Sequence, residues 1–172
     1  MRSSPCSPMM PQPPKQLWPD SPEVMSGSEG VAELSICAEA GEVRRASEWL
    51  ESSAHKLGIP ADQIYRLDLC MNEALANIVS HGGVAALSSP VHLLLDVQRD
   101  QDARMTMVTI SDAGEPFDPL SAPPKPEAKS LDEVEPGGLG LLMMQSFTDI
   151  LSYRYLDGRN ELSFGVRWIE AS

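Results

Sequence analysis

Apolar residues recur at helical spacing along two stretches of the chain. In residues 42–57 they fall on one side of a helix, which Gly58 and the following Ile59 and Pro60 would end. A longer pattern begins at Ala61 and runs to about His81. Its buried stripe is expected to consist of Leu67, Met71, Ala74, Leu75 and Ile78. Both patterns predict helices that pack on a common core.

Shorter apolar runs with polar flanks predict strands. Two runs in the middle of the chain indicate consecutive antiparallel strands, and two near the C-terminus indicate a hairpin around the turn 157–160. The predicted strands are residues 32–38, 91–97, 105–110, 149–156 and 161–168, and a further helix is predicted over residues 139–147. Together the elements predict an α/β (α+β) two-layer sandwich, with a mixed, mostly antiparallel sheet and helices on one face.

Two proline-rich segments interrupt this pattern. Seven of the fifteen prolines precede Glu23, so residues 1–30 are interpreted as a disordered tail and residues 31–170 as the folded domain. Residues 116–136 hold six prolines and show little apolar periodicity. Connections of this length without secondary structure are often lids or binding loops. The alternative is a surface loop without a function.

Composition agrees with one small domain. A chain of 172 residues with 42% hydrophobic content can form a single core. No apolar run approaches the roughly 20 residues that span a bilayer, and no signal-peptide segment is evident, so a cytoplasmic protein without a membrane partner is expected. The three cysteines lack paired or metal-type spacing, which predicts reduced thiols and no zinc site.

The charge of the chain limits its partners. A formal net charge of −12 opposes non-specific binding to nucleic acid, because phosphate contacts need clustered Lys and Arg. It does not argue against a nucleotide. Helix N-termini and a bound Mg²⁺ can neutralise a triphosphate without many basic side chains.

Three stretches carry candidate chemistry. Glu73 and Asn77 lie four residues apart in the second predicted helix and therefore share a face, where they could hold a divalent cation and orient a nucleophile. Asp112 and Gly114 follow a predicted strand at a sharp turn. A glycine cluster, residues 137–140, opens the last predicted helix and could direct free N–H groups at phosphate oxygens.

In this order and spacing the three stretches resemble the N, G1 and G2 boxes of the GHKL ATPase superfamily. Residues 67–82 are similar to the N-box helix of the small RsbW-type anti-sigma factor serine kinases of bacterial partner-switching systems. Residues 118–120, 138–141 and 158–162 also fit this group, and the resemblance covers roughly residues 32–169. It implies a Bergerat-type ATP-binding fold, with residues 116–136 as the ATP lid.

The resemblance also implies roles for single residues. Asn77 matches the asparagine that holds Mg²⁺, and Glu73 matches the glutamate proposed as general base. Asp112 matches the aspartate that accepts a hydrogen bond from the adenine amino group, and Gly114 would allow the ring to approach. Two G2 glycines, Gly138 and Gly140, would permit close approach to the phosphates.

One feature departs from the family pattern. The family often has a basic residue just before its G2 glycines, whereas this chain has Pro136 and Gly137. Lys125 and Lys129 in the predicted lid could compensate. His81 is interpreted as a helix-end residue that interacts with the helix dipole, and it is left out of the catalytic set.

Two functions remain open from the sequence. In one, the chain is an ATP-dependent serine/threonine-protein kinase that phosphorylates a STAS-domain antagonist and binds a sigma factor or another regulator. In the other, ATP only sets the conformation of a sequestration module, and no phosphate is transferred. The presence of Glu73 favours catalysis, because binding alone needs no base. The catalytic half of a histidine kinase is disfavoured, since no helical segment with a phosphoacceptor histidine is expected before the domain. Homodimers are common in the family.

Overall fold

The structure is a computed structural model that describes residues 28–100, 102–120 and 138–170. Residues 1–27 of the predicted tail and residues 121–136 of the predicted lid lie outside these residues, so the expectations for them stay predictions. Residues 28–30, which were predicted to belong to the disordered tail, are part of a strand. Among the described residues, no helix combines the length and the apolar character that a membrane crossing requires.

Five strands form one sheet in the order β1-β2-β3-β5-β4. Neighbouring strands are antiparallel at all four described pairings, so no parallel pair of the predicted mixed sheet occurs among them. The strands are β1 (Ser28–Ile36), β2 (Val91–Asp100), β3 (Ala103–Asp112), β4 (Ile150–Leu156) and β5 (Arg159–Trp168). The predicted α+β class is confirmed.

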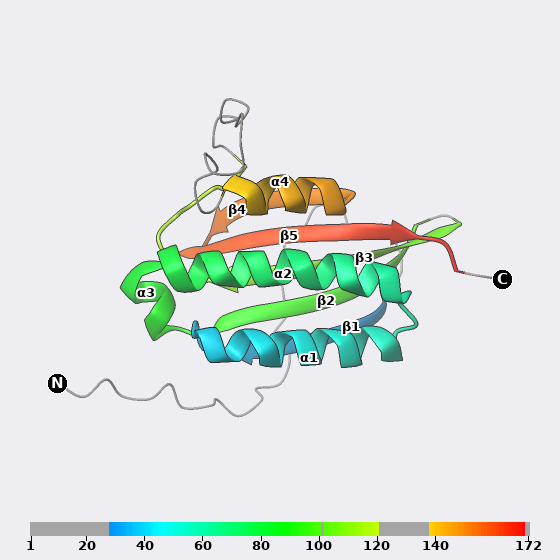
Figure 1. The fold of residues 1–172 in the computed structure, drawn as a ribbon, viewed down its shortest axis with the longest axis horizontal. Coiled ribbons are helices and arrows are strands. Elements are labelled where there is room, and N and C mark those ends of the chain that lie inside the picture. The colour runs from blue at the N-terminus through cyan, green and yellow to red at the C-terminus, as the bar shows by residue number, and fades with distance from the viewer. Residues whose placement is uncertain (1–27, 101, 121–137, 171–172) are drawn as a thin grey trace.

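Helices cover one face of this sheet (Figure 1). Figure 1 shows α2 in the middle, between α1 on the β1 side and α4 on the β4 side. The helices are α1 (Ala40–Lys56), α2 (Ala61–His81), α3 (Gly83–Ser88) and α4 (Gly138–Phe147). At one end of the layer lie the C-terminus of α2, the N-terminus of α4 and the start of β5.

The core lies between the helices and the sheet. Four residues of the predicted α2 stripe, Leu67, Met71, Ala74 and Leu75, are buried, and Ile78 packs against them from the edge. The facing strands contribute alternate residues, such as Leu93 and Leu95 of β2 and Val108 and Ile110 of β3. This alternation fixes the strand register, because a slip of one residue would move the apolar set to the open face.

Most observed elements begin and end within three residues of the predicted bounds, and two differences are larger. Strand β1 begins at Ser28 rather than residue 32, because Ser28 and Gly30 continue the pairing with Gln98 and Val97 across a register shift. Helix α3 was not predicted. It begins at Gly83, whose positive φ of 70° separates it from α2, and its apolar Val84 and Leu87 are exposed instead of forming a buried stripe.

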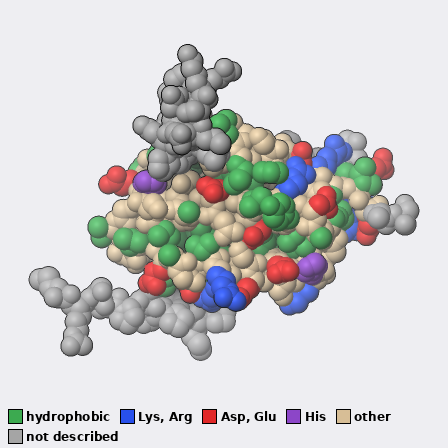
Figure 2. Space-filling model, viewed as in Figure 1, with side chains coloured by type: hydrophobic (Ala, Val, Ile, Leu, Met, Phe, Trp, Pro, Cys, Tyr) green, Lys and Arg blue, Asp and Glu red, His purple; other side chains and the backbone are tan. Residues whose placement is uncertain are grey.

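The helix-covered face also exposes hydrophobic side chains. Figure 2 shows them over α3 and around α2 and α4. The large exposed ones that lie in described helices are Tyr65, Val84, Leu87 and Leu142.

Candidate nucleotide-binding site

Helix α2 places Glu73 and Asn77 one turn apart beside α4. Both side chains are half-buried at the edge of the apolar stripe. Within the part of the chain that the structure describes, neither side chain takes part in a hydrogen bond or ion pair. A buried stripe thus fixes the helix, while the carboxylate and the carboxamide on its flank keep their oxygen atoms available.

The carboxylate of Glu73 lies against the first turn of α4. A Cβ at position 140 would come within 2.5 Å of Oε2 of Glu73 and 3.3 Å of its carboxyl carbon. Gly140 is buried, and a side chain at this position would displace the Glu73 carboxylate from where it lies. The predicted base and a predicted phosphate-binding glycine are therefore brought together, and Gly138 is the first residue of the same helix.

Asp112 ends β3 and is 6% exposed. Its Oδ1 accepts hydrogen bonds from the backbone N–H of Gly114 at 2.7 Å and from the Asn160 side chain at 3.1 Å. Its Oδ2 receives no hydrogen bond from any described residue. One oxygen is therefore held by the protein, and the other stays free for a donor such as an exocyclic amino group.

The packing of the chain also requires a glycine at position 114, apart from any approach of a ligand. A Cβ there would lie 2.8 Å from the carbonyl oxygen of Gly82 and 3.2 Å from its Cα. The loop after β3 thus packs on the backbone that joins α2 to α3. Because backbone cannot move aside as a flexible side chain can, this contact ties the Asp112 loop to the end of the helix that carries Asn77.

Sequence reasoning missed the role of Asn160 in the site. The residue was matched to the family only as part of residues 158–162, whereas the structure shows a buried side chain, 7% exposed, that bonds Asp112 and the loop after it. The two residues are opposite each other in the β3–β5 register although they are 48 positions apart in the chain. No local sequence pattern signals such a pairing.

Arg159 supports the same strand end from the other side of the sheet. Its guanidinium donates to the hydroxyl and the carbonyl oxygen of Ser111 at 2.7 and 2.9 Å, and to the carbonyl oxygen of Pro90 at 2.9 Å. Burial is the main cause that lowers the pKa of Arg159, and the charge of Asp112 opposes this shift. Arg159 and Asn160 are consecutive residues of β5, and together they hold the end of β3 at Ser111 and Asp112.

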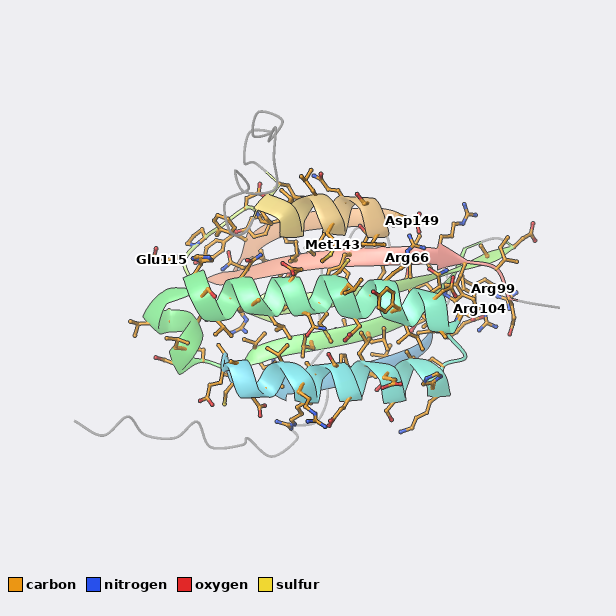
Figure 3. The ribbon with its side chains drawn as sticks, viewed as in Figure 1. Arg66, Arg99, Arg104, Glu115, Met143 and Asp149 are labelled. Carbon is orange, nitrogen blue, oxygen red and sulfur yellow. The ribbon has the colours of Figure 1, made fainter. Side chains whose placement is uncertain are left out.

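Arg66 clamps the other end of α4 to α2. Its guanidinium donates to the carbonyl oxygen of Phe147, the last residue of α4, at 2.8 Å, and it lies 3.8 Å from the carboxylate of Asp149. Figure 3 shows Arg66 and Asp149 together at this end, whereas Glu115 marks the opposite end, where α4 begins. Helix α4 thus contacts α2 near both of its ends, at Gly140 and at Phe147.

The described residues could bind a metal ion only if a bound ligand supplied further coordinating atoms. No group of three or more His, Cys, Asp or Glu side chains within them could hold a metal by itself. The oxygen of the Asn77 side chain could supply one ligand, and Mg²⁺ bound to nucleotides takes most of its others from phosphate and water. His81, the last residue of α2, is exposed. Gly137 and the predicted lid residues Lys125, Lys129 and Pro136 lie outside the described residues.

Comparisons with known proteins identify the family of the chain and two similar proteins. The family described as "Histidine kinase-like ATPase domain" matches residues 36–166. The serine/threonine-protein kinase BtrW of Bordetella bronchiseptica is 38% identical over 139 residues, which cover 81% of this chain and 94% of that protein.

A solved structure shares the fold. The RsbU and RsbW domains of Rv1364c from Mycobacterium tuberculosis superpose with a TM-score of 0.57 at 13% sequence identity. The match covers 83% of this chain and 34% of that longer chain. The family match and the 38% identity over most of both chains decide the assignment. The chain belongs to the histidine kinase-like (GHKL) ATPase family and is an RsbW-like member of it.

Proposed function

We propose that the chain is an ATP-dependent serine/threonine-protein kinase that phosphorylates a STAS-domain antagonist and sequesters a regulatory partner such as a sigma factor. The similarity to BtrW, which is named a serine/threonine-protein kinase, supports the reaction. The observation that carries the proposal is the contact of Glu73 with Gly140 next to Asn77. It sets a carboxylate that has no bonding partner among the described residues at the start of the helix expected to face the phosphates.

Adenine and phosphates would be held at separate parts of the site. Oδ2 of Asp112 would accept a hydrogen bond from the amino group of adenine, since Oδ1 is already held by Gly114 and Asn160. The first turn of α4, with Gly138 and Gly140, would direct N–H groups at phosphate oxygens. Both parts lie at the same end of the helical layer in Figure 1.

Asn77 would hold Mg²⁺ through its side-chain oxygen, one turn from Glu73. When bound, Mg²⁺ would neutralise the charge that develops on the phosphate oxygens during phosphoryl transfer. The chain carries a formal net charge of −12, which opposes the binding of a triphosphate and makes a cation at this position more important. Asn77 would therefore matter for nucleotide affinity as well as for the rate.

Glu73 would act as the general base. Its carboxylate would take the proton of the partner's serine hydroxyl while the serine oxygen forms a bond to the γ-phosphorus. The bond from that phosphorus to the bridging oxygen breaks, and ADP leaves. The free carboxylate suits this role, because a carboxylate already paired with Arg or Lys would be a weaker proton acceptor.

The second candidate is a sequestration module that binds ATP but transfers no phosphate. It would use the same Asn77, Asp112 and glycines, so the pocket alone does not separate the two functions. The half-buried carboxylate of Glu73 favours the kinase, because a binding module gains nothing from a carboxylate placed near phosphate oxygens.

Transfer of labelled phosphate distinguishes these functions. The purified chain would be incubated with γ-labelled ATP, Mg²⁺ and the STAS-domain protein encoded nearest to it. A kinase transfers the label to a serine of that protein, and the transfer disappears without Mg²⁺ or in Asn77→Ala. Binding of ATP without any transfer to a STAS-domain protein would favour the sequestration module.

A further inference from the structure

The side chain of Asn160 is the centre of a buried hydrogen-bond network. Its amide nitrogen lies 3.1 Å from Oδ1 of Asp112, and 3.2 and 3.0 Å from the carbonyl oxygens of Gly114 and Glu115. Its oxygen accepts from the backbone N–H of Phe117 at 3.2 Å and from the hydroxyl of Tyr153 at 2.7 Å. One side chain therefore spans the whole loop that follows β3.

The partners fix the orientation of this amide. A backbone N–H such as that of Phe117 can only donate, and the carbonyl oxygens of Gly114 and Glu115 can only accept. A flipped amide would set donor against donor and acceptor against acceptor at these positions. The nitrogen must therefore face Asp112, and its two hydrogens serve three acceptors, one of them in a shared bond.

This orientation decides which oxygen of Asp112 is available. Oδ1 is occupied by Asn160 and by the N–H of Gly114, so rotation of the carboxylate would break two hydrogen bonds in a buried place. Oδ2 is then the oxygen that remains available to a ligand, and as a carboxylate oxygen it can only accept a hydrogen bond. A lone acceptor at that point suits an amino group on the base and opposes a carbonyl oxygen.

We propose that Asn160 is a positioning residue for base selection: it locks Asp112 so that only Oδ2 meets the base, and it thereby sets a preference for a 6-amino over a 6-oxo purine nucleotide. The proposal rests on the proposed ATP site. Asn160 acts through Asp112 and the loop.

Three variants separate this role from simple support of the fold. Asn160→Ala removes the lock, so Asp112 can rotate. Asn160→Asp sets an acceptor oxygen where the nitrogen now faces Asp112 and two carbonyls, so the loop is repelled until the new carboxylate takes up a proton. Tyr153→Phe removes only one donor to Asn160 and is the mildest change, which keeps the proposal testable if the first two variants fold poorly.

Calorimetry with ATP and with ITP, its 6-oxo analogue, gives the readout. In Asn160→Ala the affinity for ATP should fall about tenfold and the affinity for ITP much less. The ratio of the two affinities, which measures the preference for ATP, should therefore decrease. Tyr153→Phe should decrease this preference for ATP by a few-fold, because the Asn160 side chain loses one of its hydrogen bonds. A role in folding alone would weaken both nucleotides equally and leave the preference unchanged.

The pH dependence of Asn160→Asp provides a second readout. Relative to wild type at the same pH, its ATP affinity should be lowest at about pH 8 and recover toward about pH 5, where the protonated carboxyl group of this variant can donate a hydrogen bond again. Other ionisable groups around this position are Asp112 on β3, Tyr153 and Tyr155 on β4, Arg159 on β5 and Asp118 in the loop, and the wild-type reference contains all of them.

The outcomes distinguish the inference from the function on which it rests. A wild-type chain that binds neither nucleotide would overturn both. If wild type prefers ATP and the preference is the same in Asn160→Ala, Asn160→Asp and Tyr153→Phe, only the role of Asn160 is wrong. A narrowed preference together with the recovery at low pH supports it.

Discussion

Glu73 and Gly140 are in contact across the α2–α4 interface, and a methyl group at position 140 would lie 2.5 Å from Oε2 of Glu73. The carboxylate would have to swing away to make room, because Gly140 is buried. We therefore expect Gly140→Ala to keep the fold but to lower the rate of phosphate transfer by about 10²-fold, the size of effect that a misplaced catalytic group produces.

Gly41→Ala is the matched control for this prediction. Gly41 lies in α1 with nothing within 4 Å of an added methyl group, so the change should leave transfer unaltered and stabilise the helix by about 0.5–1 kcal/mol. Transfer rates under single-turnover conditions check both variants. A wild-type rate in Gly140→Ala would show that the position of the Glu73 carboxylate does not matter.

Asp112→Asn tests which oxygen meets the base. The new oxygen can replace Oδ1 and keep the bonds from Gly114 and Asn160, so the new NH₂ group occupies the place of Oδ2. ATP should lose a charge-assisted hydrogen bond of about 1.5–3 kcal/mol, which is about ten- to a hundred-fold in affinity. Calorimetry measures it, and an unchanged affinity in the folded variant would mean that adenine binds elsewhere.

The spacing of apolar residues predicted those helices and strands whose pattern is complete within one segment of the chain. The α2 helix was predicted from Ala61 to about His81 and is observed over these residues, because its stripe faces one continuous core. Helix α3 was missed, since six residues with exposed Val84 and Leu87 carry no periodic signal.

The candidate site was predicted only where local motifs mark it. Glu73 and Gly140 were singled out separately, and their contact depends on how α4 packs on α2. The network of Asn160 depends on the β3–β5 register, which joins residues 48 positions apart. Spacing along the chain reveals which residues share a face, but a contact between elements becomes visible only once the elements are packed.

The clamp at Arg66 should stabilise the fold. Arg66→Ala would leave the carbonyl oxygen of Phe147 without its donor in a half-buried place, and we expect the free energy of unfolding to fall by about 1–3 kcal/mol. Arg44→Ala is the control, because Arg44 is 87% exposed and its pair with Glu48 is worth about 0.5 kcal/mol at most. Urea unfolding measures both, and equal losses would contradict the clamp.

Cys70 should make stability depend on pH in the alkaline range. Burial raises the pKa of its thiol from 9.0 to about 11, with a smaller lowering by Arg66. In the unfolded chain the thiol loses its proton first, so its contribution to stability is full below pH 9 and is lost as pH rises toward 11. The loss amounts to about 3 kcal/mol in all. Compared with wild type, Cys70→Ala should show a shallower fall of the unfolding free energy between pH 9 and 11. Equal slopes would contradict the shift.

The central claim is that Glu73 takes the proton of the substrate serine, and Glu73→Gln tests it most directly. The amide keeps the shape of the side chain but cannot accept a proton, so ATP affinity should stay nearly constant while single-turnover phosphorylation of the STAS-domain partner falls by about 10²–10⁴-fold. Glu51→Gln, an exposed change on α1, should leave both quantities at the wild-type value. Transfer by Glu73→Gln at the wild-type rate, with ATP bound normally, would show that Glu73 is not the base.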